Sequence, residues 1–236
     1  GVDLSTGMLE TARRLAAERG LGGAIEFVQG DAEHLGFEDA SFDAVVSLYA
    51  LRHFPDPAQA IREMRRVCRP GGQVVVGVGS GAPLLSPDFV RRQLERLADA
   101  AGSAIRPRPL EATGFLDRLV DEQLGTPDTA PDAAWTHGRT RFDSPVAALM
   151  READFRAVRV SWAGQSARIA SSDDFWRLQI TLSTRARKRY AQSTPEQQRR
   201  LREAFDLRCA EHRARGGRMI YRSGALLTRG VRPPSG

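Results

Sequence analysis

The stretch FDAVVSLYALRHFPDPAQAIREMRRVCRPGGQVVVGV, residues 42–78, decides the fold class. It opens and closes on apolar runs, residues 42–48 and 73–78, that have the length and composition of buried strands. Between them, Asp56-Pro57 predicts the start of a helix, with Gln59 at the third position completing a capping box, and Pro70-Gly71-Gly72 predicts its end. A single helix between two buried strands indicates a right-handed crossover in a parallel sheet.

The flanking sequence extends this alternation of helices and strands. Upstream, Ser5 is a predicted N-cap and Gly20 a predicted helix end, and residues 24–28 predict a short strand. Downstream, residues 155–162 alternate apolar and polar side chains as a half-exposed strand does, and residues 219–228 predict a final strand. We therefore expect an α/β, Rossmann-like fold with a mostly parallel sheet and helical insertions.

Two segments depart from this alternation. Residues 80–143 are punctuated by proline and glycine and predict an insertion or lid with helices near 87–101 and 113–124. Residues 171–215 predict a helical pair whose second helix begins with the capping box Thr194–Gln197. The expected division is a core portion at 1–79, the insertion or lid at 80–143, and the C-terminal part of the core at 144–236, which holds the helical pair.

The composition excludes several classes of protein. The chain has 236 residues, of which 41% are hydrophobic, so it can bury a sizeable core. No run approaches the ~18 consecutive apolar residues of a membrane span. The two cysteines, Cys68 and Cys209, provide neither the spacing of a metal site nor a disulfide framework, and the chain does not open on a signal peptide. We expect a reduced, cytoplasmic protein without a bound metal.

The formal net charge of +6 is carried beyond residue 80. Lys188 is the one lysine, so arginine fills the other basic positions throughout the chain. This indicates a general bias in amino-acid composition rather than a binding surface. The basic residues are mixed with acids and lack interleaved aromatic side chains. We therefore expect no nucleic-acid partner.

Acidic residues follow the first two predicted strands, where an open parallel sheet binds its ligands. Asp3 ends the apolar piece Gly1-Val2, and its carboxylate can accept two hydrogen bonds from a ribose diol. Asp31 follows the second strand, where its carboxylate can accept from the exocyclic amine of adenine while the Ala32 N–H donates to a ring nitrogen. For both acids the alternative is a residue that simply begins a turn.

The segment after the strand at 42–48 is expected to face both a cofactor and a substrate. His53 lies in this segment and is a candidate general base near neutral pH. The alternative is a histidine beside a helix that packs on Phe54, and the neighbouring sequence offers no acidic partner for it.

Taken together, GVDLSTGMLETAR, FVQGDAEHLGFEDASFDAVVS and LRHFPDPAQAIREMRRVCRPGGQVVVGV strongly resemble the class I S-adenosyl-L-methionine (SAM)-dependent methyltransferase superfamily. The most similar subgroup includes the ubiquinone/menaquinone biosynthesis methyltransferases. The resemblance implies that Asp3 binds the ribose of SAM, that Met8 packs against adenine, and that Asp31 and Ala32 hold the adenine amine. It also implies that Ser47 and Leu48 contact the methionine part. The cofactor-binding residues expected on this basis are Asp3, Leu4, Met8, Asp31, Ala32, Ser47 and Leu48.

One departure from the family pattern limits this prediction. The glycine-rich signature D-x-G-x-G-x-G, which ends the first strand of the family and approaches the methionine of SAM, belongs upstream of Asp3 and is not in this sequence. We interpret the chain as truncated before the second strand, so that it lacks the first strand and the loop after it. On that interpretation this chain alone binds SAM poorly and is inactive.

The predicted function is SAM-dependent methyl transfer to a small, apolar or aromatic acceptor. The aromatic side chains in the two insertions favour such an acceptor, although ordinary core packing explains each one equally well: Phe89, Phe115, Trp135, Phe175 and Trp176. One alternative is a catalytically inactive methyltransferase-like protein with a binding or regulatory role. The other is a nicotinamide-dependent Rossmann oxidoreductase, which explains neither the GDAE motif at 30–33 nor the RPGG turn at 69–72.

Overall fold

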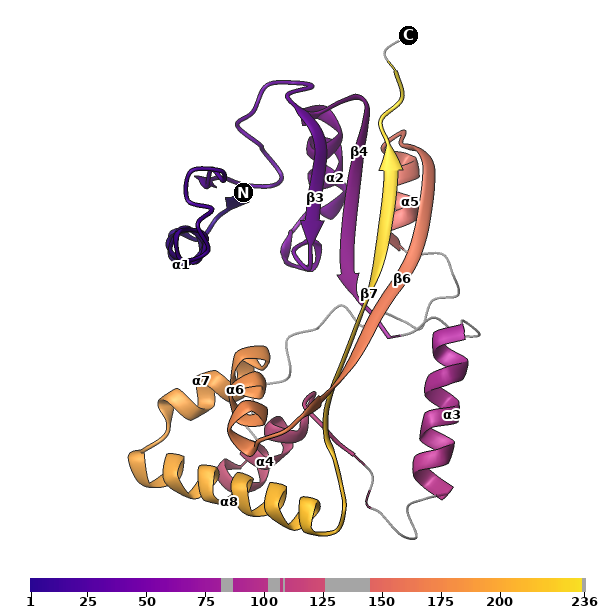
Figure 1. The fold of residues 1–236 in the computed structure, drawn as a ribbon. Coiled ribbons are helices and arrows are strands. Elements are labelled where there is room, and N and C mark those ends of the chain that lie inside the picture. Colours follow the sequence, from indigo (N-terminus) through magenta and orange to yellow (C-terminus); the bar gives the residue numbers. More distant parts are fainter. Residues whose placement is uncertain (82–86, 102–106, 108, 126–144, 235–236) are drawn as a thin grey trace. The chain divides into compact units, whose positions relative to one another are not determined.

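The computed structural model describes residues 1–81, 87–101, 107, 109–125 and 145–234 (Figure 1). The chain forms two compact units. The first unit comprises residues 1–79, 140–163 and 225–236, and the second comprises residues 80–139 and 164–224. Among the described helices, none combines the length and apolar character that crossing a membrane requires.

A small parallel sheet opens the first unit. It pairs β1 (Val2–Asp3) with β2 (Val28–Gln29), and α1 (Thr6–Glu18) connects the two strands. The Ser5 hydroxyl accepts a hydrogen bond from the Met8 N–H at 3.3 Å, which confirms the predicted N-cap. The strand expected at 24–28 is instead limited to Val28–Gln29, because β1 offers only two residues for it to pair with.

The larger sheet has the strand order β3 (Phe42–Leu48), β4 (Cys68–Gly79), β7 (Met219–Val231) and β5 (Leu110–Glu111), and β6 (Arg156–Ile169) also pairs with β7. Strands β3 and β4 are parallel and a helix lies between them in the chain, which confirms the predicted α/β class. Strands β4 and β7 are antiparallel. Two helices lie between β3 and β4: the 3-10 helix η1 (Leu51–His53) and α2 (Pro57–Val67).

The RPGG turn lies inside β4 rather than before it. The register between β3 and β4 passes from Phe42 opposite Cys68 to Ala44 opposite Gln73, so the turn bulges out of a strand that has already begun. Gly71 has a φ of 79°, a left-handed conformation that glycine adopts without steric cost.

The core of the first unit lies on one face of the larger sheet. Val74 and Val76 of β4 are fully buried there against Ile61 and Met64 of α2 and against α5 (Pro145–Glu152). Side chains alternate between the two faces of a strand. The opposite face of β3 accordingly carries Val46 and Leu48, which are 61% and 55% exposed.

The capping box predicted for α2 is only half present. The Asp56 carboxylate accepts from the Gln59 N–H at 2.9 Å, as expected. The reciprocal bond from Gln59 was a wrong prediction: the Asp56 N–H donates to the carboxylate of Glu33 at 2.9 Å. The Gln59 side chain donates instead to the Glu33 carbonyl at 3.1 Å. The first turn of α2 is therefore fastened to the segment that follows β2.

The second unit is mostly helical. Helices α3 (Pro87–Ala101) and α4 (Phe115–Leu124) lie where helices were predicted. The short strand β5 (Leu110–Glu111) was not predicted, and it pairs in parallel with the first two residues of β7.

The predicted helical pair at 171–215 is wrong in number, because the described chain there forms α6 (Ser172–Leu182), α7 (Thr184–Gln192) and α8 (Pro195–Ala214). The break falls at Ser183, which has non-helical φ and ψ of −94° and 104°. Its hydroxyl caps α7 by accepting from the Ala186 N–H at 3.0 Å. The capping box of α8 at Thr194 and Gln197 is confirmed.

Aromatic rings fill the core of the second unit. Phe205 packs 5.4 Å from Phe115, 5.8 Å from Phe175 and 5.0 Å from Trp176, measured between ring centroids. Phe115 and Trp176 are 8% exposed and Phe175 is fully buried, so packing accounts for all three. Trp135, which was also considered for an acceptor pocket, lies outside the described residues.

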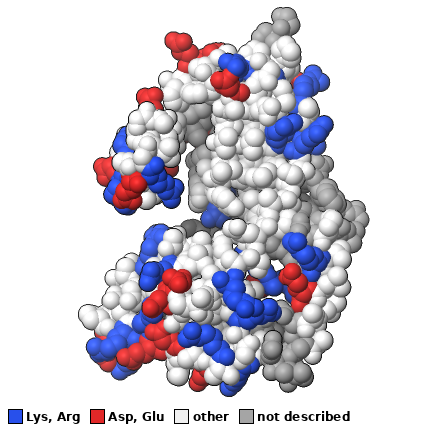
Figure 2. All heavy atoms as spheres, viewed as in Figure 1, with Lys and Arg blue, Asp and Glu red and all other residues white. Residues whose placement is uncertain are grey.

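Opposite charges are interspersed on the surface of the second unit. Figure 2 shows acidic residues among the basic ones on the face drawn, including the region of α7 and α8. On α8, Arg200 pairs with Glu196 at 2.6 Å and Arg202 pairs with Asp206 at 2.8 Å. Much of the positive charge of α8 is therefore balanced within the helix itself.

Candidate functional site

The small sheet brings Asp3 and Asp31 to the same edge. Asp3 lies opposite Gln29 in the parallel pairing, and the Gly30 N–H donates to the Asp3 carbonyl at 3.2 Å. Neighbouring strands lie ~4.8 Å apart, so the residues that follow them are close in space. A Cβ atom at Gly30 would come 3.1 Å from a methyl carbon of Val2, and the missing side chain thus allows the close approach.

Asp3 both begins a turn and keeps a free acceptor. Its Oδ1 accepts from the Ser5 N–H at 2.8 Å, which is the geometry of a turn leading into α1. Its Oδ2 has no hydrogen bond or ion pair with any residue that the structure describes. One oxygen thus shapes the backbone while the other is available to a ligand.

Asp31 lies in a tight turn. Its Oδ1 accepts from the Glu33 N–H at 2.9 Å, and its Oδ2 lies 3.6 Å from Nδ1 of His34. The Ala32 N–H has no acceptor among the described residues. A carboxylate and an unused N–H on consecutive residues can together meet the amine and a ring nitrogen of adenine.

Apolar side chains next to Asp3 are exposed. Leu4 is 65% exposed and Met8, on the first turns of α1, is 59% exposed. Both were predicted to contact the cofactor, and their exposure leaves them accessible to a flat apolar ligand.

Ser47 and Leu48 lie on opposite faces of β3. Ser47 is 8% exposed, and its hydroxyl has no partner among the described residues, whereas Leu48 is 55% exposed. Tyr49 follows with a φ of 59°, which is uncommon for a residue other than glycine, and its N–H donates to the Gly77 carbonyl at 2.7 Å. Sequence patterns gave no signal of this conformation, which marks the end of β3 as a constrained position.

His53 ends η1 and is exposed to solvent. The Arg52 side chain donates from Nε to Nε2 of His53 at 3.3 Å. The lone pair of Nε2 is therefore occupied, and a proton acceptor needs a free lone pair. A role as base requires the Arg52 side chain to move away.

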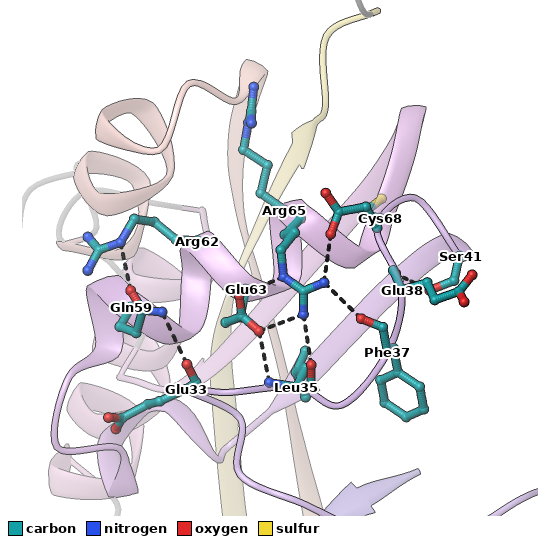
Figure 3. Close-up of polar contacts among 12 residues, drawn as sticks. Glu33, Leu35, Phe37, Glu38, Ser41, Gln59, Arg62, Glu63, Arg65 and Cys68 are labelled. Carbon is teal, nitrogen blue, oxygen red and sulfur yellow. Dashed lines mark hydrogen bonds and ion pairs between the residues drawn. The ribbon is translucent and has the colours of Figure 1, made fainter.

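Sequence reasoning missed a polar network beside Asp31. Glu33, Glu63 and Arg66 connect α2 to the segment between β2 and β3 (Figure 3). The spacing of Glu63 and Arg66, three residues apart on one helix, was the available signal of a pair. That spacing did not predict that both side chains also bind the backbone of Leu35, in the segment between β2 and β3.

Comparison with known proteins identifies the N-terminal part of the chain. Residues 1–76 match the model of the methyltransferase domain family. The chain is 47% identical over 74 residues to the ubiquinone/menaquinone biosynthesis C-methyltransferase of Hahella chejuensis, which covers 31% of this chain and 30% of that protein. It is 30% identical over 178 residues to the enzyme of the same name from Rhodopseudomonas palustris, covering 75% of this chain and 62% of that protein.

A relative named for a different activity also matches over a short region. The phosphatidylethanolamine N-methyltransferase of Cereibacter sphaeroides is 43% identical over 76 residues, covering 32% of this chain and 37% of that protein. The chain thus spans between 30% and 62% of the length of these curated relatives. Residues 1–76 thus match a methyltransferase domain, which confirms for this part of the chain the predicted resemblance to the class I SAM-dependent methyltransferase superfamily.

Proposed function

We propose that this protein transfers the methyl group of SAM to a small apolar or aromatic acceptor, and that residues 1–32 provide the adenosine-binding part of the SAM site. The observation that carries the proposal is the parallel pairing of β1 with β2, which brings Asp3 and Asp31 to neighbouring strand ends. The donor and acceptor groups there fit adenosine: a free carboxylate oxygen on Asp3, the Asp31 carboxylate and the unused N–H of Ala32.

Each residue has a stated task in this proposal. Oδ2 of Asp3 accepts from the ribose hydroxyls, and Asp31 with Ala32 binds the edge of adenine. Leu4 and Met8 cover the faces of the adenosine, and Ser47 and Leu48 at the end of β3 bind the methionine part. SAM supplies an electrophilic methyl group on sulfur, so the protein has mainly to orient the acceptor and to exclude water.

The proposal assigns His53 to a hydroxyl or amine acceptor, whose proton a base removes as the methyl group is transferred. An activated carbon acceptor needs less help from a base. The match over 75% of this chain is to a protein named as a C-methyltransferase, which makes an electron-rich aromatic ring, such as a quinol, the first acceptor to test.

Ligand binding and methyl transfer by the protein expressed from its complete gene test the proposal. At 100 times the Kd, SAM or S-adenosylhomocysteine (SAH) should stabilise the folded state by about 2.7 kcal/mol, whereas NAD should not. Methyl transfer from radiolabelled SAM is then measured with a quinol and with phosphatidylethanolamine. A failure of SAM and SAH to raise the melting temperature would refute the proposal. Stabilisation without transfer to any acceptor would favour a catalytically inactive binding protein.

A further inference from the structure

The segment between β2 and β3 carries Asp31 but has little regular secondary structure of its own. From Gly30 to Ser41 its described backbone forms only an isolated bridge between Asp31 and His34, with turns and bends elsewhere. A segment of this kind must find partners for its backbone groups outside itself. Its conformation, and therefore the direction of the Asp31 carboxylate, depends on what holds it.

Arg66 of α2 holds the middle of the segment. Its guanidinium donates to the carbonyls of Leu35 at 2.7 Å and Phe37 at 2.8 Å, and to the Asp39 carboxylate at 2.8 Å (Figure 3). The planar guanidinium has five N–H donors in a fixed geometry, so one side chain can fix several acceptors at once.

Glu63 completes the attachment from one turn earlier in α2. Its two carboxylate oxygens accept from Nε and Nη2 of Arg66, both at 2.8 Å, and its Oε2 also accepts from the Leu35 N–H at 2.8 Å. Leu35 therefore has both backbone groups bound, its N–H by Glu63 and its carbonyl by Arg66. The side chain of Glu63 is only 13% exposed, so solvent competes little for these bonds.

The electrostatics keep this pair charged. The hydrogen bond from Arg66 holds the pKa of Glu63 below its ordinary value of 4.5, and the same bond raises the pKa of Arg66. At neutral pH both groups are therefore ionised, and charge-assisted, bidentate bonds of this kind are stronger than neutral ones.

A second attachment lies nearer to Asp31. The Glu33 carboxylate accepts from the Asp56 N–H, and the Glu33 carbonyl accepts from the Gln59 side chain. The segment is thus tied to the first turn of α2 at Glu33 and to its last turns at Leu35, Phe37 and Asp39. Asp31 is two residues from the first of these ties.

We propose that Glu63 and Arg66 are positioning residues for adenine recognition, which hold the segment from Glu33 to Asp39 so that Asp31 and the Ala32 N–H present a fixed edge to the base. The proposal rests on the proposed SAM site. Neither side chain is assigned to the ligand itself: Arg66 reaches only Glu63, Leu35, Phe37 and Asp39 in the described structure.

The test compares Arg66→Ala, Arg66→Lys and Glu63→Gln in the protein expressed from its complete gene. The control is Arg65→Ala, which removes an arginine of the same helix whose side chain pairs with Asp154 at 3.1 Å and not with the segment that follows β2. Two quantities are measured: hydrogen exchange of residues 33–39 without ligand, and the ratio of the affinities for SAH and for S-inosylhomocysteine, in which a carbonyl oxygen replaces the adenine amine.

We expect Arg66→Ala to speed exchange of this segment and to weaken SAH binding about tenfold, while S-inosylhomocysteine binding changes much less, so that the ratio falls. Lysine keeps the positive charge but lacks the planar guanidinium with its fixed donors. The exchange rate and the affinity ratio of Arg66→Lys should therefore lie between those of Arg66→Ala and the wild type. Glu63→Gln should reproduce the loss in part, and Arg65→Ala should change neither quantity. If Arg66→Ala does not fold, Arg66→Lys and Glu63→Gln carry the test.

Faster exchange in Arg66→Ala with an unchanged affinity ratio would overturn the positioning role, because Glu63 and Arg66 would then stabilise the segment without affecting adenine recognition. An unchanged exchange rate would overturn it as well. If the wild type binds neither ligand, the proposed SAM site itself fails, and that outcome is recognised in the wild type before any variant is compared.

Discussion

Replacing Asp3 by asparagine separates the two tasks that the structure gives this side chain. Oδ1 accepts from the Ser5 N–H at 2.8 Å, and the amide oxygen of asparagine can keep that bond. Oδ2, which has no partner among the described residues, becomes an NH2 group that donates where the ribose hydroxyls need an acceptor. The turn before α1 is therefore preserved while the proposed ligand contact is lost.

The expected magnitude follows from these contacts. A hydrogen bond to a charged group contributes about 1.5–3 kcal/mol, and the acceptor lost is one charged oxygen. The affinity for SAH should fall by a factor of about 10 to 150. Because the side chain is exposed, the free energy of unfolding without ligand should change by no more than about 0.5 kcal/mol.

Calorimetric titration with SAH, on the protein expressed from its complete gene, measures the effect, and urea unfolding without ligand checks the fold. The matched control is Glu10→Gln, which removes an exposed carboxylate from the neighbouring helix α1. A SAH analogue without ribose hydroxyls should bind the wild type and Asp3→Asn equally. An Asp3→Asn protein that binds SAH within twofold of the wild type would refute the assignment of Asp3 to the ribose.

Three further predictions concern the parts of the chain outside this site. Phe205→Ala should destabilise the second unit by about 3–5 kcal/mol, measured by urea unfolding, because the fully buried ring contacts three other aromatic rings; a loss below 1 kcal/mol would contradict this packing. Burial raises the pKa of the Cys68 thiol and raises that of Cys209 to about 11, so neither should react with a thiol reagent at pH 8 until urea is added. Burial lowers the pKa of His212 below its ordinary value of 6.5, so the folded state favours the neutral ring, and the stability that is complete above pH 6.5 should decline as the pH falls below 6.5; His212→Gln should remove this dependence in urea titrations at several pH values.

The parts of the fold that the sequence predicts well are those whose causes are local. The N-cap at Ser5 and the capping box at Thr194 need only residues within one turn, and both are present. The start of α2 needed more, because its Asp56 N–H is satisfied by Glu33, a residue 23 positions earlier. A sequence pattern read within one helix cannot include such a partner.

The division of the helices in the second unit failed for a related reason. Ser183 is a tolerable residue inside a helix, and the apolar spacing of the segment gives no sign of a break there. In the structure its hydroxyl caps α7 and also donates to the Asp117 carboxylate of α4 at 2.5 Å. Serine side chains compete with the helical backbone in this way, but the competition is decided by a partner on another helix.

For the candidate site, the sequence identified the residues at strand ends, and the structure adds which faces of the strand they occupy. Ser47 and Leu48 are neighbours on β3, and neighbours on a strand point to opposite faces. Ser47 shares the buried face with Val76 and Thr228, its successive partners across the sheet, whereas Leu48 is on the open face with Val46. A ligand lying against the open face can touch the side chain of Leu48 but only the backbone of Ser47. The proposed contact of Ser47 with the methionine part is therefore one that alanine could make equally well, and the side-chain contribution of β3 falls to Leu48.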